Sequence, residues 1–239
     1  MPNPCVICGS TKTVRSHLLP AAFGRDLRGG GANFWIGNTE RPGKTISQSG
    51  IFDEFLCETH ESQIHDYENY AIEFIRDFSL SQVEIDAKAF RRDETDNEAL
   101  IRFVCSVLWR FHHSARPEAQ DVDLGEWEPN IRSVTFGGSV YQAPDVFMSA
   151  IHQAVLPKDA FMLTPTPGMQ WGQRVIQFSL AGLAFNTKLD HGEWPPAIQG
   201  AVLNRTPNWL ASYVHHWGEQ EWEGLKVAVA QMQKLKGGR

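Results

Sequence analysis

The stretch CVICGSTKTVRSHLLP, residues 5–20, opens with two cysteines, Cys5 and Cys8, separated by two residues. A second pair with the same spacing, Cys57 and His60, follows later in the chain. Two intervening residues let a tight turn point both side chains at one ion, and two such pairs can complete a tetrahedron. The pairs therefore predict a structural Zn²⁺ site with Cys5, Cys8, Cys57 and His60 as its ligands.

Cysteine use favours metal ligation over disulfide cross-linking. The 239 residues contain four cysteines, which is too few for a disulfide scaffold of this size and is typical of a reducing compartment. The remaining one, Cys105, lies among apolar residues at helical spacing between Leu100 and Phe111. We therefore expect Cys105 to be an ordinary core residue.

Apolar segments are short throughout the sequence. No run reaches the roughly 18 apolar residues of a membrane-spanning helix, and the first residues lack the apolar segment of a secretory signal. We expect a cytoplasmic protein that does not bind membranes.

Charge is unevenly distributed along the chain. The net charge is −6, which argues against general binding of polyanions. Residues 1–50 nevertheless hold six Lys or Arg and two acidic residues, a local charge of +4, which leaves −10 on the other 189 residues. We therefore expect any contact with nucleic acid in this basic N-terminal quarter, which includes a glycine-rich loop after Pro20.

The segment after the second ligand pair has the pattern of a helix. Apolar residues repeat at intervals of three and four between Ile64 and Phe78, which predicts an amphipathic helix. Glu61, His65 and Glu68 lie at i, i+4 and i+7 on another flank, where two side chains can share a metal ion. A solvated acidic flank with an incidental histidine is the alternative interpretation.

His17 ends a short strand-like run, residues 13–17, and Pro20 prevents the strand from continuing because it removes a hydrogen-bond donor. A strand ending in His17, a return strand ending at the second ligand pair and then a helix form a ββα arrangement stapled by zinc. We expect an α+β fold with this module at residues 1–80.

The order of these motifs resembles a known family. Cys-x2-Cys is followed by Ser-His-Leu-Leu-Pro at residues 16–20, then by Leu-Cys-x2-His at residues 56–60, and finally by a helix that contains Tyr67-Glu68. This order resembles the HNH, or ββα-metal, endonuclease superfamily and in particular the "SHIIP"-type bacterial and phage proteins. The resemblance covers residues 1 to 75.

The resemblance implies a metal-dependent nuclease that hydrolyses phosphodiester bonds of DNA, in the setting of bacterial or phage defence. It implies that His17 is the general base that activates water. It also implies a divalent ion, Mg²⁺ or Mn²⁺, that neutralises the leaving oxygen, with Glu61 and His65 as its ligands.

A binding module is the alternative function. Ser16 stands where many relatives carry Asp or His, and no Asn precedes Leu56 at the usual position. These departures favour a catalytically degenerate HNH-like zinc module that binds nucleic acid or protein.

Residues 81–239 predict a mainly helical C-terminal domain with one β-hairpin or small sheet. The hairpin is expected at residues 174–189, around Ala181-Gly182. Helices are expected at residues 97–114, after a capping box that begins at Thr95, at residues 144–154 and at residues 206–236. This domain has no catalytic motif, and its tryptophans are suited to core packing, to a protein partner or to a homo-oligomer.

Overall fold

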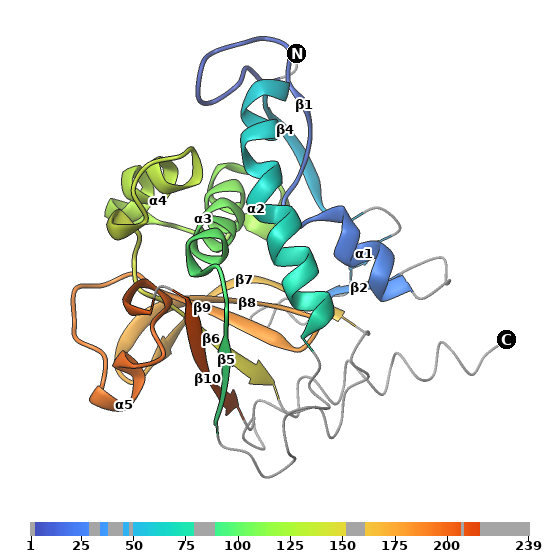
Figure 1. Ribbon diagram of the computed structural model, residues 1–239. Coiled ribbons are helices and arrows are strands. Elements are labelled where there is room, and N and C mark those ends of the chain that lie inside the picture. Colours follow the sequence, from blue (N-terminus) through green and yellow to red (C-terminus); the bar gives the residue numbers. More distant parts are fainter. Residues whose placement is uncertain are drawn as a thin grey trace, which may run out of the picture.

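The computed structural model describes residues 3–28, 34–37, 45–47, 50–78, 89–151, 161–206 and 208–215. These residues form a two-stranded sheet with a long helix, an eight-stranded sheet, and further helices, of which the one at residues 97–113 lies between the two sheets (Figure 1). The part of the chain that is described contains no helix with the length and apolar character needed to cross a membrane.

The N-terminal ββα unit consists of β1 (Val14–His17), β4 (Phe52–Leu56) and α2 (Glu58–Asp77). The two strands pair antiparallel, with His17 opposite Phe52. The stripe predicted for α2 is buried as expected, since Ile64, Tyr67, Ala71, Phe74 and Ile75 all face the core. The short helix α1 (Ala21–Arg28) begins directly after Pro20.

The other strands of the described chain form one large sheet. They are β2 (Phe34–Gly37), β3 (Thr45–Ser47), β5 (Ala89–Asp93), β6 (Val146–Ile151), β7 (Phe161–Gln170), β8 (Gln173–Leu180), β9 (Leu183–Lys188) and β10 (Trp209–His215). Their order in the sheet is β3-β2-β7-β8-β9-β6-β10-β5. The prediction of a mainly helical body with one hairpin or small sheet is therefore wrong for the described residues.

The predicted hairpin is confirmed. β8 and β9 pair antiparallel, and the two-residue turn has positive φ at Ala181 (48°) and Gly182 (83°). Positive φ at both central residues is typical of the type I′ turn, whose twist matches that of the flanking strands.

Two expected helices are strands instead. β6 lies within residues 144–154, and β10 lies at the start of residues 206–236; residues 216–236 are outside the described part of the chain. β6 pairs antiparallel with β9 and parallel with β10. A short apolar run has the same composition in a buried strand and in a helix, so the distant pairing partners decide its conformation.

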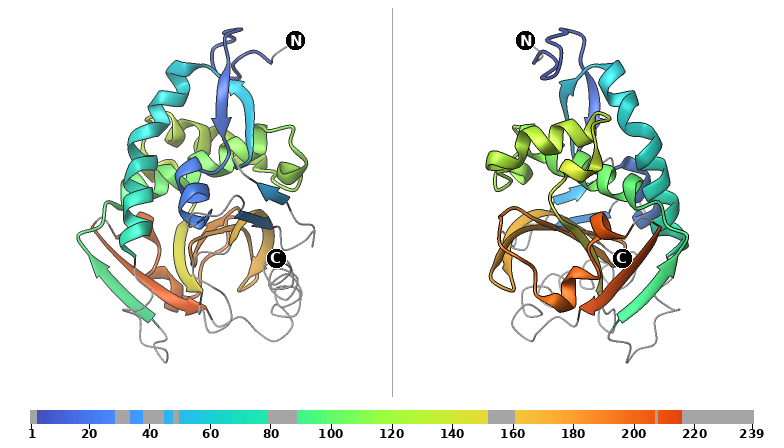
Figure 2. Two further views of the ribbon diagram at one scale, coloured as in Figure 1. Left: turned by 90° about the vertical axis from the view of Figure 1, so that its right-hand side faces the viewer. Right: turned by 60° about the vertical axis from the view of Figure 1, so that its left-hand side comes forward.

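The remaining helical elements connect the strands. They are α3 (Asn97–His113), α4 (Glu128–Thr135), α5 (Pro196–Gln199), and the 3₁₀ helices η2 (Pro117–Ala119), η3 (Gly125–Trp127), η4 (Val140–Gln142) and η5 (Leu203–Arg205). α2 and α3 lie on one side of the curved sheet (Figure 2). Phe103 of α3 contacts Phe178 and Phe185 of the sheet edge to face, at ring-centroid distances of 6.2 and 5.8 Å.

One core joins the predicted domains 1–80 and 81–239. The main cluster of buried apolar residues extends from Cys5 through α2 and α3 to Leu210 in β10. In addition, β2 pairs parallel with β7, so a strand from the N-terminal part belongs to the large sheet. The ββα unit therefore packs directly on the rest of the chain.

The cap of α3 differs from the expected one. The structure shows Asp96 as the N-cap, with its Oδ1 accepting a hydrogen bond of 2.9 Å from the backbone N–H of Ala99. Thr95, the expected cap, instead donates to Oδ1 of Asn97 at 2.8 Å. The motif thus marks the start of the helix correctly but is shifted by one residue.

Replacing Asp96 with Ala should lower the free energy of unfolding by about 1 kcal/mol, because the N–H of Ala99 loses its acceptor. Asp96→Asn is the control, and it should stay within a few tenths of a kcal/mol of wild type, since Asn caps equally well. Urea denaturation followed by circular dichroism measures both. Equal stability of Asp96→Ala and wild type would contradict the assignment of this cap.

Candidate metal centre and the adjoining histidine

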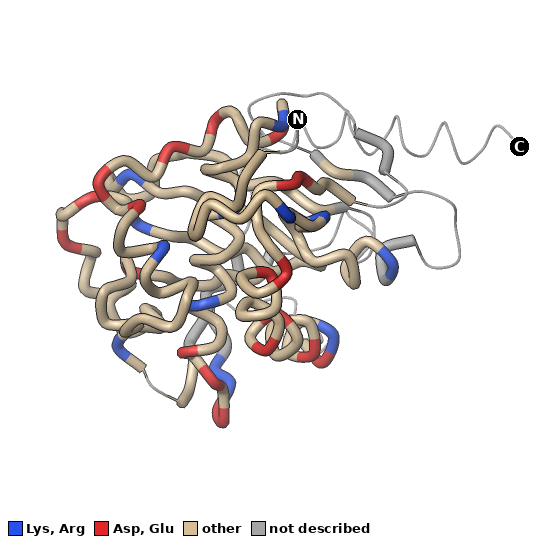
Figure 3. The backbone as a smooth tube through the Cα atoms, turned by 90° about the horizontal axis from the view of Figure 1, so that it is seen from above, with Lys and Arg blue, Asp and Glu red and all other residues tan. Residues whose placement is uncertain are grey.

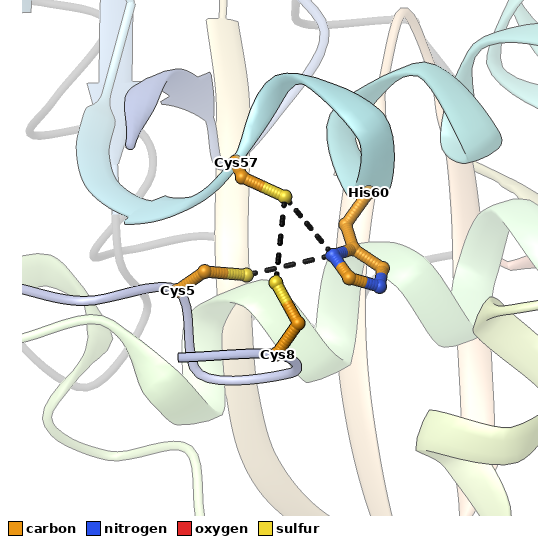
Figure 4. Close-up of side chains that lie close together, drawn as sticks. All are labelled: Cys5, Cys8, Cys57 and His60. Carbon is orange, nitrogen blue, oxygen red and sulfur yellow. Dashed lines mark hydrogen bonds between the residues drawn. The ribbon is translucent and has the colours of Figure 1, made fainter. Parts of the chain in front are cut away.

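The four predicted zinc ligands converge on one point (Figure 4). Cys5 and Cys8 come from the loop before β1, Cys57 is the N-cap of α2, and His60 lies in the first turn of that helix. Their ligand atoms all lie within 4.8 Å of one another. The group could therefore hold a metal ion such as zinc.

The backbone explains why the first pair points at the second pair. The N–H of Gly9 donates to the carbonyl of Cys5 at 2.8 Å, and the N–H of Cys5 donates to Ser10, also at 2.8 Å. Gly9 has φ of 73°, a conformation that glycine adopts at little cost. A bond of 3.0 Å from the N–H of Val6 to the carbonyl of Phe55 attaches this turn to β4, beside the second pair.

Two of the distances within the group match the edges of a tetrahedral zinc site. Zn–S bonds of about 2.3 Å and Zn–N bonds of about 2.0–2.1 Å give tetrahedral edges of about 3.8 Å for S···S and about 3.5 Å for S···N. Sγ of Cys8 lies 3.8 Å from Sγ of Cys57, and Sγ of Cys5 lies 3.5 Å from Nδ1 of His60. Cys57 and His60 are closer, at 3.1 Å. Nδ1 is the nitrogen that His60 presents to the group.

The thiols of Cys5 and Cys105 differ in acidity. Burial raises the pKa of Cys5, but hydrogen bonds from the backbone of Cys8, Cys57 and Ile7 outweigh burial and lower that pKa to about 6. Burial raises the pKa of Cys105 to about 12. A thiolate is the form that binds a metal, so Cys5 is suited to ligation, whereas Cys105 is a core residue as predicted.

His17 lies at the end of β1 that is farther from the group, since Val14 pairs with Leu56, next to Cys57, whereas His17 pairs with Phe52. Ser16, the preceding residue, is buried, and its hydroxyl donates to Oε2 of Glu61 in α2 at 2.7 Å. Since side chains alternate along a strand, His17 points to the opposite side of β1 from α2. There its half-buried ring contacts the ring of Phe52 at a centroid distance of 6.1 Å.

Glu61 and His65 occupy different environments. Burial raises the pKa of Glu61 above its ordinary value, and the carboxylate of Glu68 acts in the same direction, whereas Arg110 and the Ser16 hydroxyl oppose the shift. His65 is exposed on α2, one turn further on. Among the described residues, the Cys₃His group is the only set of three or more His, Cys, Asp or Glu close enough to share an ion. His17, Glu61 and His65 are not brought together into a second such set.

Arg110 is a residue of the site that the sequence motifs do not predict. This residue of α3 is buried, donates from Nη1 to the backbone carbonyl of His17 at 2.6 Å, and forms an ion pair with Glu68. The available signal was a basic residue inside the apolar run of residues 107–111. A charge in the middle of a core stripe requires a partner, which indicates a polar contact of this kind.

The basic character of the N-terminal quarter is only partly described. Arg15 is exposed in β1, with its guanidinium carbon 3.3 Å from the centroid of the Phe52 ring. Arg25 is exposed in α1, and the glycine-rich loop with Arg41 and Lys44 lies outside the described residues. Figure 3, which looks down on the ββα unit, shows basic and acidic residues interspersed on this side.

Comparison of the chain with protein-family models, curated proteins and solved structures finds no match.

Cys57→Ala should abolish metal binding, because it removes one of four converging ligands, whereas Cys105→Ala should retain the metal of the wild type. Elemental analysis of the purified proteins measures this, with about one zinc ion expected per wild-type chain. The melting temperature should fall in Cys57→Ala and in wild type treated with a chelator. The assignment fails if wild type contains no metal, or if Cys57→Ala and Cys105→Ala bind equal amounts.

Proposed function

We propose that the chain is an HNH-like ββα-metal nuclease, with a structural Zn²⁺ on its Cys₃His group, that hydrolyses phosphodiester bonds of DNA. Bacterial or phage defence is the setting we propose for it. One observation carries the proposal. The hydrogen bond from Ser16 to Glu61 joins the strand residue just before His17 to a helix carboxylate that directly follows the ligand His60.

The proposed zinc has a structural role. A zinc ion bound by three thiolates and one imidazole has four protein ligands, so no position is left open for water or substrate. The ion would hold the loop before β1 against the first turn of α2. The chemistry would then take place at His17, at the other end of β1 from the zinc.

His17 is the proposed general base. Its imidazole lies on the side of β1 that faces away from α2, and it is half-buried, so one part of the ring is accessible. Imidazole can take a proton from water near neutral pH, and a positioned base of this kind contributes about 10²- to 10⁴-fold to a rate. The water would attack phosphorus while His17 removes its proton.

A divalent cation, Mg²⁺ or Mn²⁺, would supply the charge that stabilises the leaving oxygen. Glu61 and His65 are its proposed ligands, since they are one helical turn apart on α2. The Ser16 hydroxyl would orient the Glu61 carboxylate. The cation would then lie on the α2 side of β1, opposite the side to which His17 points, and this separation favours the second candidate function.

A binding module is the second candidate function, and the same contact favours it. Glu61 already accepts a hydrogen bond from Ser16, and it lies within the electrostatic influence of Arg110. Both interactions can satisfy the carboxylate without a second metal ion. A protein partner or a second copy would then dock on the body, where Met169 and Trp171 expose 68% and 52% of their surface at the β7–β8 turn.

His17→Ala should lower the rate of plasmid cleavage with Mg²⁺ or Mn²⁺ by about 100-fold or more, while zinc content and melting temperature stay near wild type. His191→Ala is the control, because His191 is also a histidine but is exposed and far along the chain. It should cleave like wild type. Glu61→Ala and His65→Ala should cleave slowly and be partly rescued by higher concentrations of the divalent ion.

Two results would reject the nuclease in favour of the binding module. One is a wild-type protein without divalent-dependent cleavage of any nucleic acid. The other is His17→Ala with the cleavage rate of wild type.

Arg15→Gln should weaken DNA binding, because Arg15 is an exposed cation two residues before His17 on the same side of β1. The slope of log K against log salt should fall in magnitude by about 0.9, the loss of one phosphate contact. Arg91→Gln is the control, since Arg91 of β5 also stacks on an aromatic ring, that of Trp209, and β5 is well separated from β1 (Figure 1). Fluorescence anisotropy without added divalent ions measures both. Equal slopes in the two variants would exclude Arg15 from the interface.

A further inference from the structure

We infer that Arg110 is a positioning residue that couples the sheet-based body to the His17 end of β1. The inference rests on the proposed nuclease function, because positioning matters for catalysis only if His17 acts on a substrate. Under this inference, a residue of α3, outside the ββα unit, helps to position His17.

The burial of Arg110 is the first argument. Its side chain is 0% exposed on α3, between the buried aromatic residues Trp109 and Phe111. Taking a guanidinium out of water costs several kcal/mol unless it is paired and hydrogen-bonded. A charged guanidinium at this position is therefore stable only if all its N–H groups have partners. The positions of those partners show which elements Arg110 connects.

The partners all lie at the junction between α3, α2 and β1. Nη1 donates to the carbonyl of His17 at 2.6 Å, and Nη2 pairs with Oε1 of Glu68 in α2. Nε donates to the carbonyl of Ser106 at 3.2 Å, and Nη2 also lies 3.3 Å from the Ser106 hydroxyl. The planar guanidinium makes these contacts in fixed relative directions, which a lysine cannot do. The geometry therefore ties three elements together at one rigid group.

The peptide bond between His17 and Leu18 is held from both sides. Its carbonyl accepts from Arg110, and its N–H donates to the carbonyl of Ile51 at 2.9 Å. This peptide immediately follows the Cα of His17, so it limits where the imidazole can lie. A displacement of about 1 Å from the reacting geometry can cost about 100-fold in rate.

The test is the double variant Arg110→Met/Glu68→Leu. Removing both partners of a buried ion pair is often neutral or stabilising, whereas removing one strands the other charge. The double variant should keep the zinc and the melting temperature of wild type, but its kcat for DNA cleavage should fall by about 100-fold with little change in KM. If it does not fold, Arg110→Lys replaces it; this variant keeps the charge, and its kcat should also fall.

The same helix offers a matched control. Arg102 of α3 pairs with Glu98 and donates from Nη1 to the carbonyl of Val134 at 2.7 Å, a similar set of contacts in a more exposed pair away from His17. Arg102→Met/Glu98→Leu should keep the kcat of wild type. The inference is overturned if the Arg110 double variant keeps the kcat of wild type, or if the two double variants lose activity equally.

Hydrogen exchange at the Leu18 amide separates this inference from the nuclease proposal, since it needs no activity. In the Arg110 double variant that amide should exchange faster, while the amide of Val6, which is bonded to Phe55, should be unchanged. If wild type cleaves nothing, the nuclease proposal fails, but the exchange rate at the Leu18 amide still tests whether Arg110 fixes the end of β1. An unchanged rate in the double variant would show that it does not.

Discussion

The meeting of three thiols and one imidazole at the N-terminal end of α2 is the contact from which the ββα unit is organised. Cys8 and Cys57 are 49 residues apart in sequence, yet their sulfur atoms are 3.8 Å apart. Bringing such distant residues together costs conformational entropy, although this cost grows only slowly with loop length. A bound ion, as we propose, would offset the cost and would also place the first turn of α2, because Cys57 is the N-cap of that helix.

β1 and β4 pair next to this group. Because side chains alternate along a strand, neighbouring residues of β1 face opposite sides. Ser16 faces α2 and bonds to Glu61, whereas His17 faces away and contacts Phe52. One strand thereby separates a buried polar contact from a more accessible imidazole. The same arrangement accounts for both functions considered above. A carboxylate held by a hydroxyl can bind a cation, or it can simply be satisfied where it is.

The eight-stranded sheet is connected to this site through α3. On one side α3 packs Phe103 against Phe178 and Phe185 of the sheet, and near its end it directs Arg110 toward His17 and Glu68. Burial would by itself lower the pKa of Arg110, but Glu68 and Glu61 raise it above its ordinary value, so the guanidinium remains charged. The packing of α3 against the large sheet therefore fixes the position of the Arg110 guanidinium. In this way the sheet supports the His17 end of β1.

The sequence alone predicted those features that depend on residues close together in the chain. These are the two ligand pairs, the helices α2 and α3, and the β8–β9 hairpin with its two-residue turn. Each follows from a local spacing or a local backbone preference. The likeness to HNH proteins also rests on such spacings, and it stays a prediction.

The tertiary structure was needed wherever a residue's role depends on a distant partner. β6 and β10 were predicted as helices because their apolar runs fit either conformation, and only their pairing with β9 and with each other makes them strands. Arg110 was not singled out because its partner at His17 is 93 residues away in sequence. A buried charge indicates that some partner exists, but only the packing of α3 against β1 and α2 identifies it.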